Sequence, residues 1–460
     1  MKLRIWQSEC VEQALQKYQT GSHFFCLATP GAGKTIMAAE VARRLMASDL
    51  IDLVICFSPS SAVVLGIKET FQSVLNENFD GLIGAVGASY TYQSMPHLSH
   101  EFWKLLELRK VLVVFDEIHH CVGSNISNCN SLGEQILANI QGKANYTLAM
   151  SGTPWRTDCA PLVLANYCDT TNLVKCDYEY GLSEAVRDGV CRNPNIVLID
   201  NDECSIIDAD EGQITFSGFE ELLNNKFVNY RSIINDTDAV DYMLKAAHQK
   251  LVEVRTGQPN AAGLVVASSI SHAQFICKRI KENFDISAML VNYLTPNSQG
   301  IINHFKTSAD VWIVSVGMIS EGTDIPRLQV CCHLTQIKTE MYYRQILGRI
   351  LRKTIKDTEH AWLYTFSEKK LVKYANRISL DIPDYPAITK LKVNEKLNNI
   401  GTGSQDNELI IEGPTIENLG LHTSHPPSIT WNEYPREEVV RIVLSNKYKE
   451  SVLRVFDSPF

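Results

Sequence analysis

Features that define whole classes of proteins are absent from this 460-residue sequence. Its thirteen cysteines are scattered and include no C-x-x-C pair, so we expect reduced cysteines that pack as small apolar residues, not zinc ligands or disulfides. No stretch approaches the roughly 18 apolar residues of a membrane span. The first residues, MKLRIWQSEC, lack the apolar segment of a signal peptide. We therefore expect a protein that has no membrane contact, is not secreted, and works in the cytoplasm or on the nucleoid.

An excess of positive charge is also absent. The 43 Lys and Arg residues are outnumbered by 52 Asp and Glu residues, which gives a net charge of −9. A module that passively coats nucleic acid is basic overall, so this class is disfavoured. An enzyme that contacts phosphates through a local groove and backbone amides remains compatible with the charge.

Short apolar segments alternate with helical segments in two separate series. The first series is HFFCLA (23–28), a helix at 35–47, DLVICF (52–57), VLVVF (111–115) and TLAM (147–150). The second is GLVVA (263–267), SAMLV (287–291), VWIVSV (311–316), QVCCHL (329–334) and AWLYTF (361–366). This pattern predicts an α/β fold with two tandem parallel-sheet lobes, each covered by helices. Ligands of such sheets bind at the carboxyl ends of the strands.

The regions outside the two series have a different character. Residues 178–249 are more polar and are interpreted as a helical connector without strands. The chain then divides into lobe one (1–177), the connector (178–249), lobe two (250–372) and a short C-terminal extension (373–460).

In the extension, GTGSQDN (401–407) predicts a loop and 436–455 predicts a last helix. Its apolar positions include Val440, Leu444, Val452 and Val455, which would pack against the body of the protein or dock a partner.

The segment ATPGAGKT (28–35) follows the first predicted strand and precedes a helix. Gly31 and Gly33 allow a tight turn in which backbone amides, including that of Ala32, point at a phosphate. Lys34 can neutralise the terminal phosphates, and the hydroxyl of Thr35 can hold magnesium. These five residues predict a nucleoside triphosphate site with ATP and Mg²⁺ as ligands.

DEIHH (116–120) follows the strand VLVVF directly. A carboxylate at a strand end can reach magnesium, which suits Asp116, and Glu117 can orient and deprotonate the attacking water. A GTPase would need an N-K-x-D-like sequence, and VKCD (174–177) lacks the asparagine. A small-molecule kinase would leave the second lobe unexplained.

YRQILGRILR (343–352) places Arg349 and Arg352 three residues apart on one face of a predicted helix. Its apolar residues fall on the other face and can pack in the core. Two arginines that come so late in the chain predict an ATPase whose site is complete only when the two lobes meet.

In their order, these residues resemble the superfamily two helicases, in the group of the RecG-like, UvsW-like and type III restriction motor subunits. The resemblance covers about 3–366 and implies two RecA-like lobes. LRIWQ (3–7) resembles the adenine-sensing motif with Gln7 as its reader, although Ile5 and Trp6 stand where the family has proline and tyrosine. Three further segments resemble motifs that grip the strand or couple hydrolysis to movement: FSPSS (57–61), TYQSM (91–95) and SGTPWR (151–156).

The resemblance continues through the second lobe. GLVVASSISHA (263–273) resembles a phosphate-contacting turn, and MISEGTDIP (318–326) resembles the motif in which Gly322 and Asp324 contact both nucleic acid and ATP. YRQILGRILR resembles the Q-x-x-G-R-x-x-R helix. The resemblance implies that Gln345 faces His119 across the cleft and that Arg349 and Arg352 reach the γ-phosphate.

Several alternatives stay open at this point. The resemblance favours DNA over RNA as the nucleic-acid partner, but an RNA helicase fits the same residues. A restriction, defence or repair motor that translocates without unwinding also fits and would act with a nuclease or repair protein. A nuclease acting alone is disfavoured because no carboxylate cluster lies outside the motor. A non-hydrolysing scaffold would not need Lys34, Glu117 or the two arginines.

Overall fold

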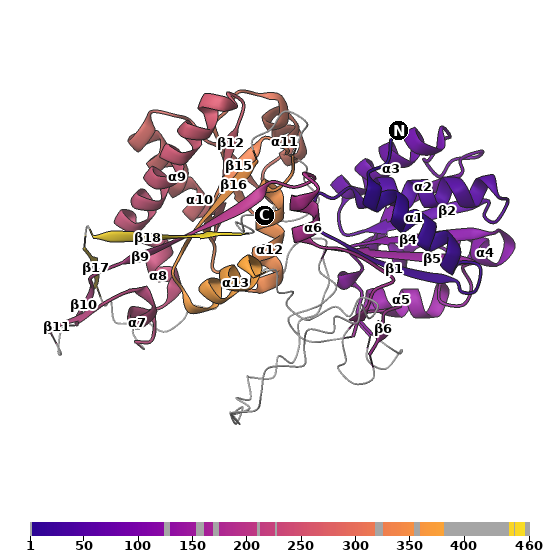
Figure 1. Cartoon of the computed structure of the whole chain (residues 1–460), viewed down its shortest axis with the longest axis horizontal. Coiled ribbons are helices and arrows are strands. Elements are labelled where there is room, and N and C mark those ends of the chain that lie inside the picture. Colours follow the sequence, from indigo (N-terminus) through magenta and orange to yellow (C-terminus); the bar gives the residue numbers. More distant parts are fainter. Residues whose placement is uncertain are drawn as a thin grey trace.

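The computed structural model describes residues 2–123, 129–152, 161–168, 174–208, 212–225, 228–317, 325–353, 359–380, 441–445 and 447–455. Two α/β lobes lie side by side, with the linking helix α6 (Leu182–Arg187) between them (Figure 1). The alternating series predicted both lobes, and each predicted strand of the two series is present within two residues of its expected bounds.

The sheet of lobe one is entirely parallel, in the order β3-β2-β4-β5-β1-β8. Its strands are β1 (His23–Ala28), β2 (Leu53–Ser58), β3 (Gly87–Thr91), β4 (Val111–Asp116), β5 (Tyr146–Ser151) and β8 (Tyr178–Tyr180). Side chains alternate between the two faces: Phe24 and Cys26 belong to one buried cluster, whereas Phe25 and Leu27 belong to the other. Such strands are apolar on both faces, as expected when helices cover both.

The helices of lobe one divide between these two faces. Residues of α1 (Ile5–Lys17), α2 (Lys34–Ala47) and α3 (Ser61–Leu75) pack into the cluster of Phe24. Residues of the 3₁₀ helix η1 (Tyr92–His97), α4 (His100–Leu108) and α5 (Ser131–Asn139) pack into the cluster of Phe25. The remaining elements are the 3₁₀ helix η2 (Ile118–His120) and the short pair β6 (Asn166–Tyr167) and β7 (Val174–Lys175).

The sheet of lobe two has the order β13-β14-β12-β15-β16-β9-β18. Its strands are β9 (Asn193–Asn201), β12 (Ala262–Ala267), β13 (Met289–Asn292), β14 (Trp312–Val316), β15 (Leu328–Leu334), β16 (His360–Phe366) and β18 (Tyr448–Arg454). Its helices are α8 (Tyr230–Asn235), α9 (Thr237–Gly257), α10 (Ile270–Phe284), α11 (Ser298–Thr307), α12 (Glu340–Ile350) and α13 (Lys369–Ser379). All pairings are parallel except that of β18 with β9.

The prediction of a connector without strands was wrong at 178–180, where β8 joins the first sheet, and for much of 193–216. There β9 is an inner strand of the second sheet, and β10 (Cys204–Asp208) pairs with β11 (Gly212–Phe216). The signal that was missed is the run of four consecutive apolar residues at 196–199 in β9. These residues are buried, and β9 lies between β16 and β18 in the sheet. The helices of the connector, including α7 (Phe219–Leu223) and the 21-residue α9, agree with the prediction.

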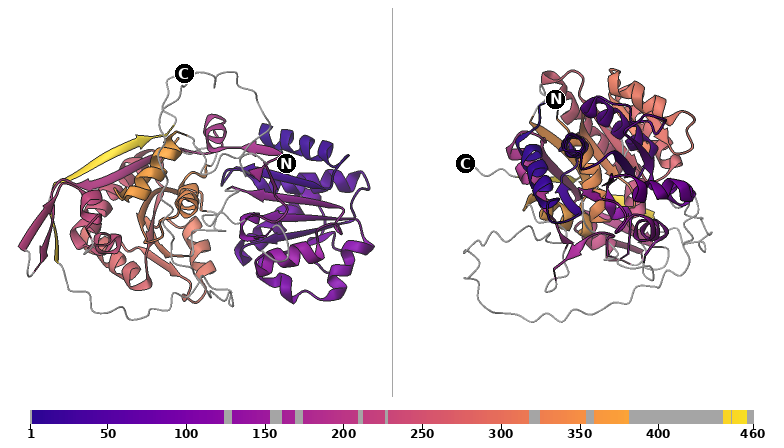
Figure 2. Two further views of the ribbon diagram at one scale, coloured as in Figure 1. Left: turned by 90° about the horizontal axis from the view of Figure 1, so that it is seen from below. Right: turned by 90° about the vertical axis from the view of Figure 1, so that its right-hand side faces the viewer.

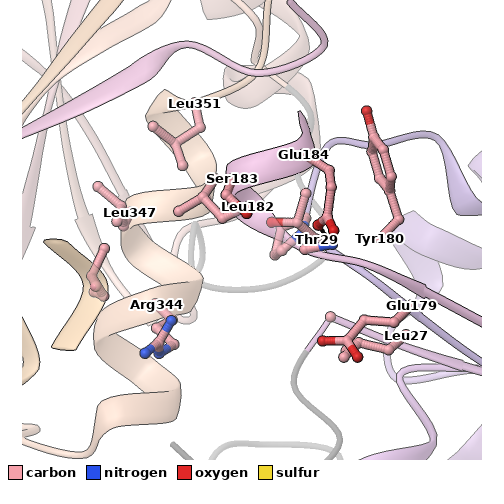
Figure 3. Close-up of a pocket in the computed structure, with 15 residues that line it drawn as sticks. Leu27, Thr29, Glu179, Tyr180, Leu182, Ser183, Glu184, Arg344, Leu347 and Leu351 are labelled. Carbon is pink, nitrogen blue, oxygen red and sulfur yellow. Dashed lines mark hydrogen bonds between the residues drawn. The ribbon is translucent and has the colours of Figure 1, made fainter. Parts of the chain in front are cut away.

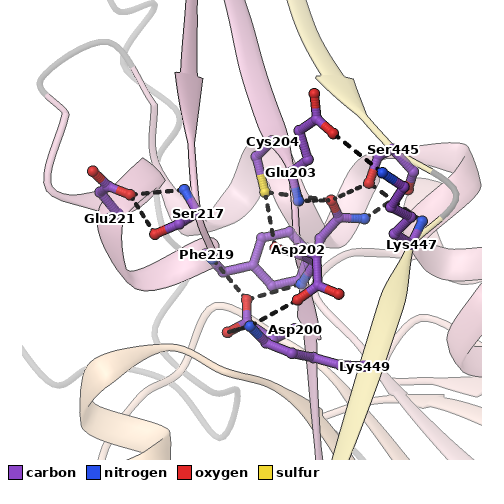
Figure 4. Close-up of polar contacts among 11 residues, drawn as sticks. Asp200, Asp202, Glu203, Cys204, Ser217, Phe219, Glu221, Ser445, Lys447 and Lys449 are labelled. Carbon is purple, nitrogen blue, oxygen red and sulfur yellow. Dashed lines mark hydrogen bonds and ion pairs between the residues drawn. The ribbon is translucent and has the colours of Figure 1, made fainter.

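The predicted last helix at 436–455 was also wrong. The chain forms β17 (Arg441–Leu444), which pairs with β10, and β18, which pairs antiparallel with β9. The apolar residues within 436–455 are spaced as in an amphipathic helix. However, β18 is an edge strand, and its conformation is fixed by its pairing with β9. The polar turn between the two strands is held to the end of β9, because the Asn201 Nδ2 donates to the Ser445 carbonyl at 2.7 Å. Lys449, in β18, pairs with Asp202, which follows β9, at 3.0 Å (Figure 4).

The three-stranded sheet β11-β10-β17 extends beyond the far end of lobe two, away from lobe one (Figure 2). The predicted loop at 401–407 lies outside the described residues. Most of the described cysteines are buried, among them Cys10, Cys26, Cys56, Cys331 and Cys332. No described helix has the length and apolar character needed to cross a bilayer.

Candidate nucleotide site

The predicted phosphate loop connects β1 to α2 at the carboxyl edge of the first sheet. Gly31 has a φ of +85° and Gly33 a φ of +96°, both in the left-handed region that favours glycine. Gly33 is the N-cap of the 14-residue α2. The first amides of a helix have no partner within the helix and carry its positive end, so this loop has the geometry of an anion site.

The N-terminus of α1 supports this loop from one side. The Arg4 Nη1 donates to the Ala32 carbonyl at 2.6 Å, and the Gln7 Nε2 donates to the Gly33 carbonyl at 2.9 Å. A Cβ placed on Gly33 would lie 2.8 Å from the Gln7 Nε2. Gln7, predicted as the adenine reader, therefore holds the loop backbone in this structure. Arg4 was missed by sequence reasoning, and its place three residues before Gln7 was the only signal.

Lys34 lies at the start of α2 with only 9 % of its surface exposed. Its Nζ donates to the Ala28 carbonyl at 3.1 Å and lies 3.1 Å from the Glu117 Oε1. The half-buried Thr35 follows in the first turn of the same helix. The ammonium is thus oriented toward the strand ends, where the predicted carboxylates lie.

Asp116 is the last residue of β4, which lies between β2 and β5 in the sheet. Its carboxylate is buried, and its Oδ1 has no hydrogen-bond partner among the described residues. Burial, followed by the charge of Glu117, raises the pKa of Asp116 to about 7. A buried carboxylate oxygen without a donor, at the carboxyl edge of the sheet, fits a hard cation such as Mg²⁺.

Glu117 has an unusual backbone conformation, with φ at +52°. Non-glycine residues in this region carry a conformational cost and gather at functional sites. Its Oε2 accepts from the Ser151 Oγ and from the Gly152 amide, each at 3.2 Å. Burial opposes ionisation, but the charge of Lys34 and the contact with His119 hold the pKa of Glu117 well below its ordinary value. The carboxylate is therefore ionised while Lys34 lies beside it.

His119 connects the ends of β4 and β5. Its ring is 1 % exposed, and its Nδ1 lies 2.9 Å from the Ser151 Oγ and 3.4 Å from the Glu117 Oε2. Tyr92, within the predicted strand-contacting motif TYQSM, donates its hydroxyl to the Asp116 carbonyl at 2.8 Å. One hydrogen bond thus joins a motif predicted to contact nucleic acid to a residue predicted to bind Mg²⁺, and sequence reasoning had no signal for this link.

The C-terminal turn of α12 lies against the phosphate loop. A Cβ placed on Gly348 would lie 2.8 Å from the Pro30 Cβ, and one on Gly31 would lie 3.1 Å from the Arg352 Cγ. Arg349 is 8 % exposed within this turn. Arg352 is therefore at the interface between the lobes, and Arg349 is buried in the adjoining turn. Gln345 is buried on the same helix, and its contact with His119 stays a prediction.

Cys191 lies at this junction, where several positively charged side chains act on its thiol. Its Sγ lies 3.8 Å from the Pro30 carbonyl oxygen, and its backbone pairs with that of Arg352. Burial raises the pKa of the Cys191 thiol to about 11, against the opposing charges of Arg4, Arg352, Arg192 and Lys34. These four cations come from both lobes and from the linking segment. Their convergence beside the phosphate loop favours a polyanion such as a triphosphate.

A cavity of about 150 Å³ opens between the lobes next to this junction. Thr29, Pro30 and Gly152 line it from lobe one, whereas Arg344, Leu347 and others line it from α12. Figure 3 shows Arg344 on the α12 side and Glu179 on the opposite side. The predicted residues Gly322 and Asp324, and residues 153–156 of SGTPWR, lie outside the described residues.

Two family models match the chain in tandem. Residues 1–156 match the type III restriction enzyme res subunit, and residues 245–354 match the helicase conserved C-terminal domain. The first match contains the phosphate loop and the Asp116–Glu117 pair. The second contains both arginines.

The curated relatives that match are uncharacterized mycobacterial proteins. One from Mycobacterium leprae is 28% identical over 365 residues, which cover 76% of this chain and 59% of the relative. One from Mycobacterium tuberculosis is 27% identical over 394 residues, which cover 82% of this chain and 63% of the relative. The chain thus spans about three fifths of the length of these relatives.

Solved structures share the fold at low sequence identity. A fragment assigned as the HsdR subunit of a type I restriction enzyme from Vibrio vulnificus has a TM-score of 0.55 at 15% identity, over 84% of this chain and 68% of that chain. The ATP-dependent type ISP restriction-modification enzyme LlaBIII, bound to DNA, has a TM-score of 0.54 at 14% identity, over 85% of this chain and 31% of that chain. The fold of this chain is therefore that of two tandem RecA-like lobes.

Proposed function

We propose that this chain, which is a superfamily two helicase and hence an ATP-hydrolysing enzyme, is a motor that moves along a nucleic-acid backbone, with DNA as its favoured substrate. The observation that carries the proposal is the contact between the lobes at the phosphate loop, where the Arg352 Cγ would lie 3.1 Å from a Cβ on Gly31. A site divided between two lobes can couple the state of the nucleotide to their separation.

In the proposed reaction, Lys34 exchanges its Glu117 partner for the β- and γ-phosphates. Thr35 and Asp116 would hold Mg²⁺, which neutralises charge on the phosphate oxygens. Glu117, released from Lys34, accepts the proton of the water that attacks the γ-phosphorus. The bond between that phosphorus and the bridging oxygen breaks, and ADP and phosphate leave. Arg349 and Arg352 stabilise charge on the phosphoryl group during the transfer.

Hydrolysis in this scheme requires closed lobes, because the arginines belong to one lobe and the loop to the other. Closure and reopening would then shift the grip of each lobe on the backbone of the strand. Phosphate and sugar contacts should dominate, since a motor has to be indifferent to sequence. We place TYQSM, Gly322 and Asp324 among these contacts on the basis of the family resemblance.

The preference for DNA rests on the match of lobe one to a restriction motor and on the DNA-bound type ISP neighbour. The yeast protein Dbp5, bound to RNA, has a TM-score of 0.50 at 12% identity, so an RNA substrate is the second candidate. The likeness to restriction-enzyme subunits supports a motor that works with a nuclease or repair protein.

The ATPase rate, measured with single-stranded DNA, duplex DNA, branched DNA and RNA in turn, tests this proposal. We expect stimulation by at least one DNA form over RNA, and a loss of stimulation as salt rises, because contacts with phosphates release counterions. Stronger stimulation by RNA would overturn the DNA preference. Absence of phosphate release with every polynucleotide would overturn the motor itself.

A further inference from the structure

Arg192 is a fully buried arginine at the point where the chain enters lobe two. It directly follows Cys191, whose Sγ lies 3.8 Å from the Pro30 carbonyl of the phosphate loop, and directly precedes β9. Its side chain therefore extends from the segment that joins the lobes, next to the candidate nucleotide site. Neither its burial nor its contacts are explained by the chemistry proposed above.

The Arg192 guanidinium holds the end of α12. Its Nη1 donates to the Ile350 carbonyl at 2.9 Å and also to the Arg352 carbonyl. The Arg192 backbone amide donates to the Leu351 carbonyl at 2.8 Å. The last carbonyls of a helix have no partner within it and carry its negative end, so a cation that donates to them fixes and stabilises that end.

The same guanidinium holds a second segment. Its Nη1 donates to the Leu328 carbonyl at 3.0 Å, and its Nη2 donates to the Pro326 carbonyl at 2.9 Å. Pro326 comes two residues after Asp324, which the family resemblance assigns to ATP and nucleic-acid contacts. One planar fork thus joins the start of β15 to the turn that bears Arg349 and Arg352. A lysine ammonium has no such fork and could not hold both segments in the same geometry.

We propose that Arg192 is a positioning residue, which holds the turn carrying Arg349 and Arg352 at the phosphate loop and ties that turn to the segment after Asp324. The inference rests on the proposed function. Arg192 acts through backbone carbonyls, so its part in the reaction is to set where the two guanidinium groups lie when the lobes meet. Misplacement of a catalytic group by about 1 Å can cost about a hundredfold in rate.

A merely structural role would lower stability without a selective effect on turnover. Arg192→Lys keeps the charge and most of the volume but loses the fork, and Arg192→Met also loses the charge. Arg187→Ala is the matched control, because Arg187 belongs to the same linking segment, is 63% exposed and forms an ion pair with the adjacent Asp188. Thermal unfolding of each full-length variant identifies those that fold.

The test measures kcat and KM for ATP with saturating nucleic acid, together with hydrogen exchange of peptides covering 326–330 and 345–353. For Arg192→Lys we expect a fall in kcat of about ten- to a hundredfold, with KM within about threefold and with faster exchange in both peptides. Arg187→Ala should match the wild type. Combined with Arg352→Ala, Arg192→Lys should add little further loss, because both changes affect one unit.

The outcomes separate this inference from the proposed function. A wild type that hydrolyses ATP, with an Arg192→Lys variant of equal kcat, overturns only the positioning role. Independent losses in the double variant overturn it as well. A wild type without ATPase activity overturns the proposed function. In that case unchanged exchange at 345–353 in Arg192→Lys overturns the positioning role separately, whereas faster exchange there supports it.

Discussion

The two lobes assemble their sheets from different lengths of chain. In lobe one, β1 to β5 all lie between residues 23 and 151, and β8 follows soon after. In lobe two, β12 to β16 lie between residues 262 and 366, but β9 comes from 193–201 and β18 from 448–454. Lobe one is therefore a continuous unit, whereas lobe two is completed by the linking segment and by the end of the described chain.

This difference extends to the site. In the proposed site, lobe one supplies Lys34, Asp116 and Glu117 from motifs that begin at the last residue of a strand. In the proposed site, lobe two supplies Arg349 and Arg352 from a helix end whose last carbonyls accept hydrogen bonds from Arg192, a residue of the linking segment. The comparison predicts that lobe one binds the nucleotide by itself, whereas the contribution of lobe two depends on how its pieces are joined.

Removal of the acid in lobe one should give the largest effect. Glu117→Gln should abolish ATP hydrolysis while ATP still binds, because the amide cannot accept the proton and Lys34 is freed for the phosphates. Lys34→Ala should lose hydrolysis and weaken binding too. Phosphate release and calorimetric titration with ATP measure both. A fully active Glu117→Gln enzyme would show that another group is the base.

Crowding at the meeting point of the lobes should come next. Gly31→Ala adds a Cβ at positive φ and 3.1 Å from the Arg352 Cγ, so we expect kcat to fall by about tenfold or more. Gly142→Ala is the control, since Gly142 has a φ of +75° and no heavy atom within 4 Å of the added Cβ. It should lose only stability, about 1 to 2 kcal/mol, in urea unfolding. Equal kcat losses in the two variants would argue against a specific role for the Arg352 contact.

The completion of lobe two by the last strands predicts a large loss of stability on truncation. A chain that ends at residue 440 lacks β17 and β18, and it exposes the edge of β9 that pairs with Tyr448–Arg454. We expect lobe two to lose roughly 3 kcal/mol or more in urea unfolding, with a tendency to aggregate through the open edge. Val452→Ala, at a position 45% exposed on β18, should change stability by less than about 0.5 kcal/mol. An unchanged unfolding midpoint in the truncated chain would contradict this dependence.

Acid should lower the stability of lobe two more than that of lobe one. This is the smallest of the expected effects. Burial lowers the pKa to about 4 for His272 and His333 in lobe two and for His23 in lobe one. The unfolded chain binds these protons near pH 6.5, so the stability is present above that pH and is lost as the pH falls toward 4. Each of these histidines should lower the free energy of unfolding by about 1 kcal/mol when the pH falls from 7.5 to 5.5.

Urea unfolding of each lobe at the two pH values measures this difference. His333→Leu, at a fully buried position, should remove one histidine's share of the pH dependence in lobe two. An unchanged pH dependence in that variant would contradict the assignment.

Sequence predicts those parts of the molecule whose signals are local. Continuous apolar runs such as VLVVF predicted the strands, and the glycines of ATPGAGKT predicted the turn that precedes α2. The strand β18 escaped prediction because its order comes from pairing with a distant strand, and its own residues are mostly exposed. The same reason applies to Arg192, whose partners are backbone carbonyls that no sequence pattern marks. Gln7 was predicted as a base reader, but the approach of α1 to the loop decides what its amide contacts.

The central claim is that a guanidinium from lobe two acts on a triphosphate held by lobe one. The most direct test is the Arg352→Ala variant, with kcat measured at saturating ATP and nucleic acid and with the affinity for a non-hydrolysable ATP analogue measured beside it. The account predicts a loss in kcat on the order of 10³, with the affinity changed by only a few fold. A variant that keeps the wild-type kcat would contradict it.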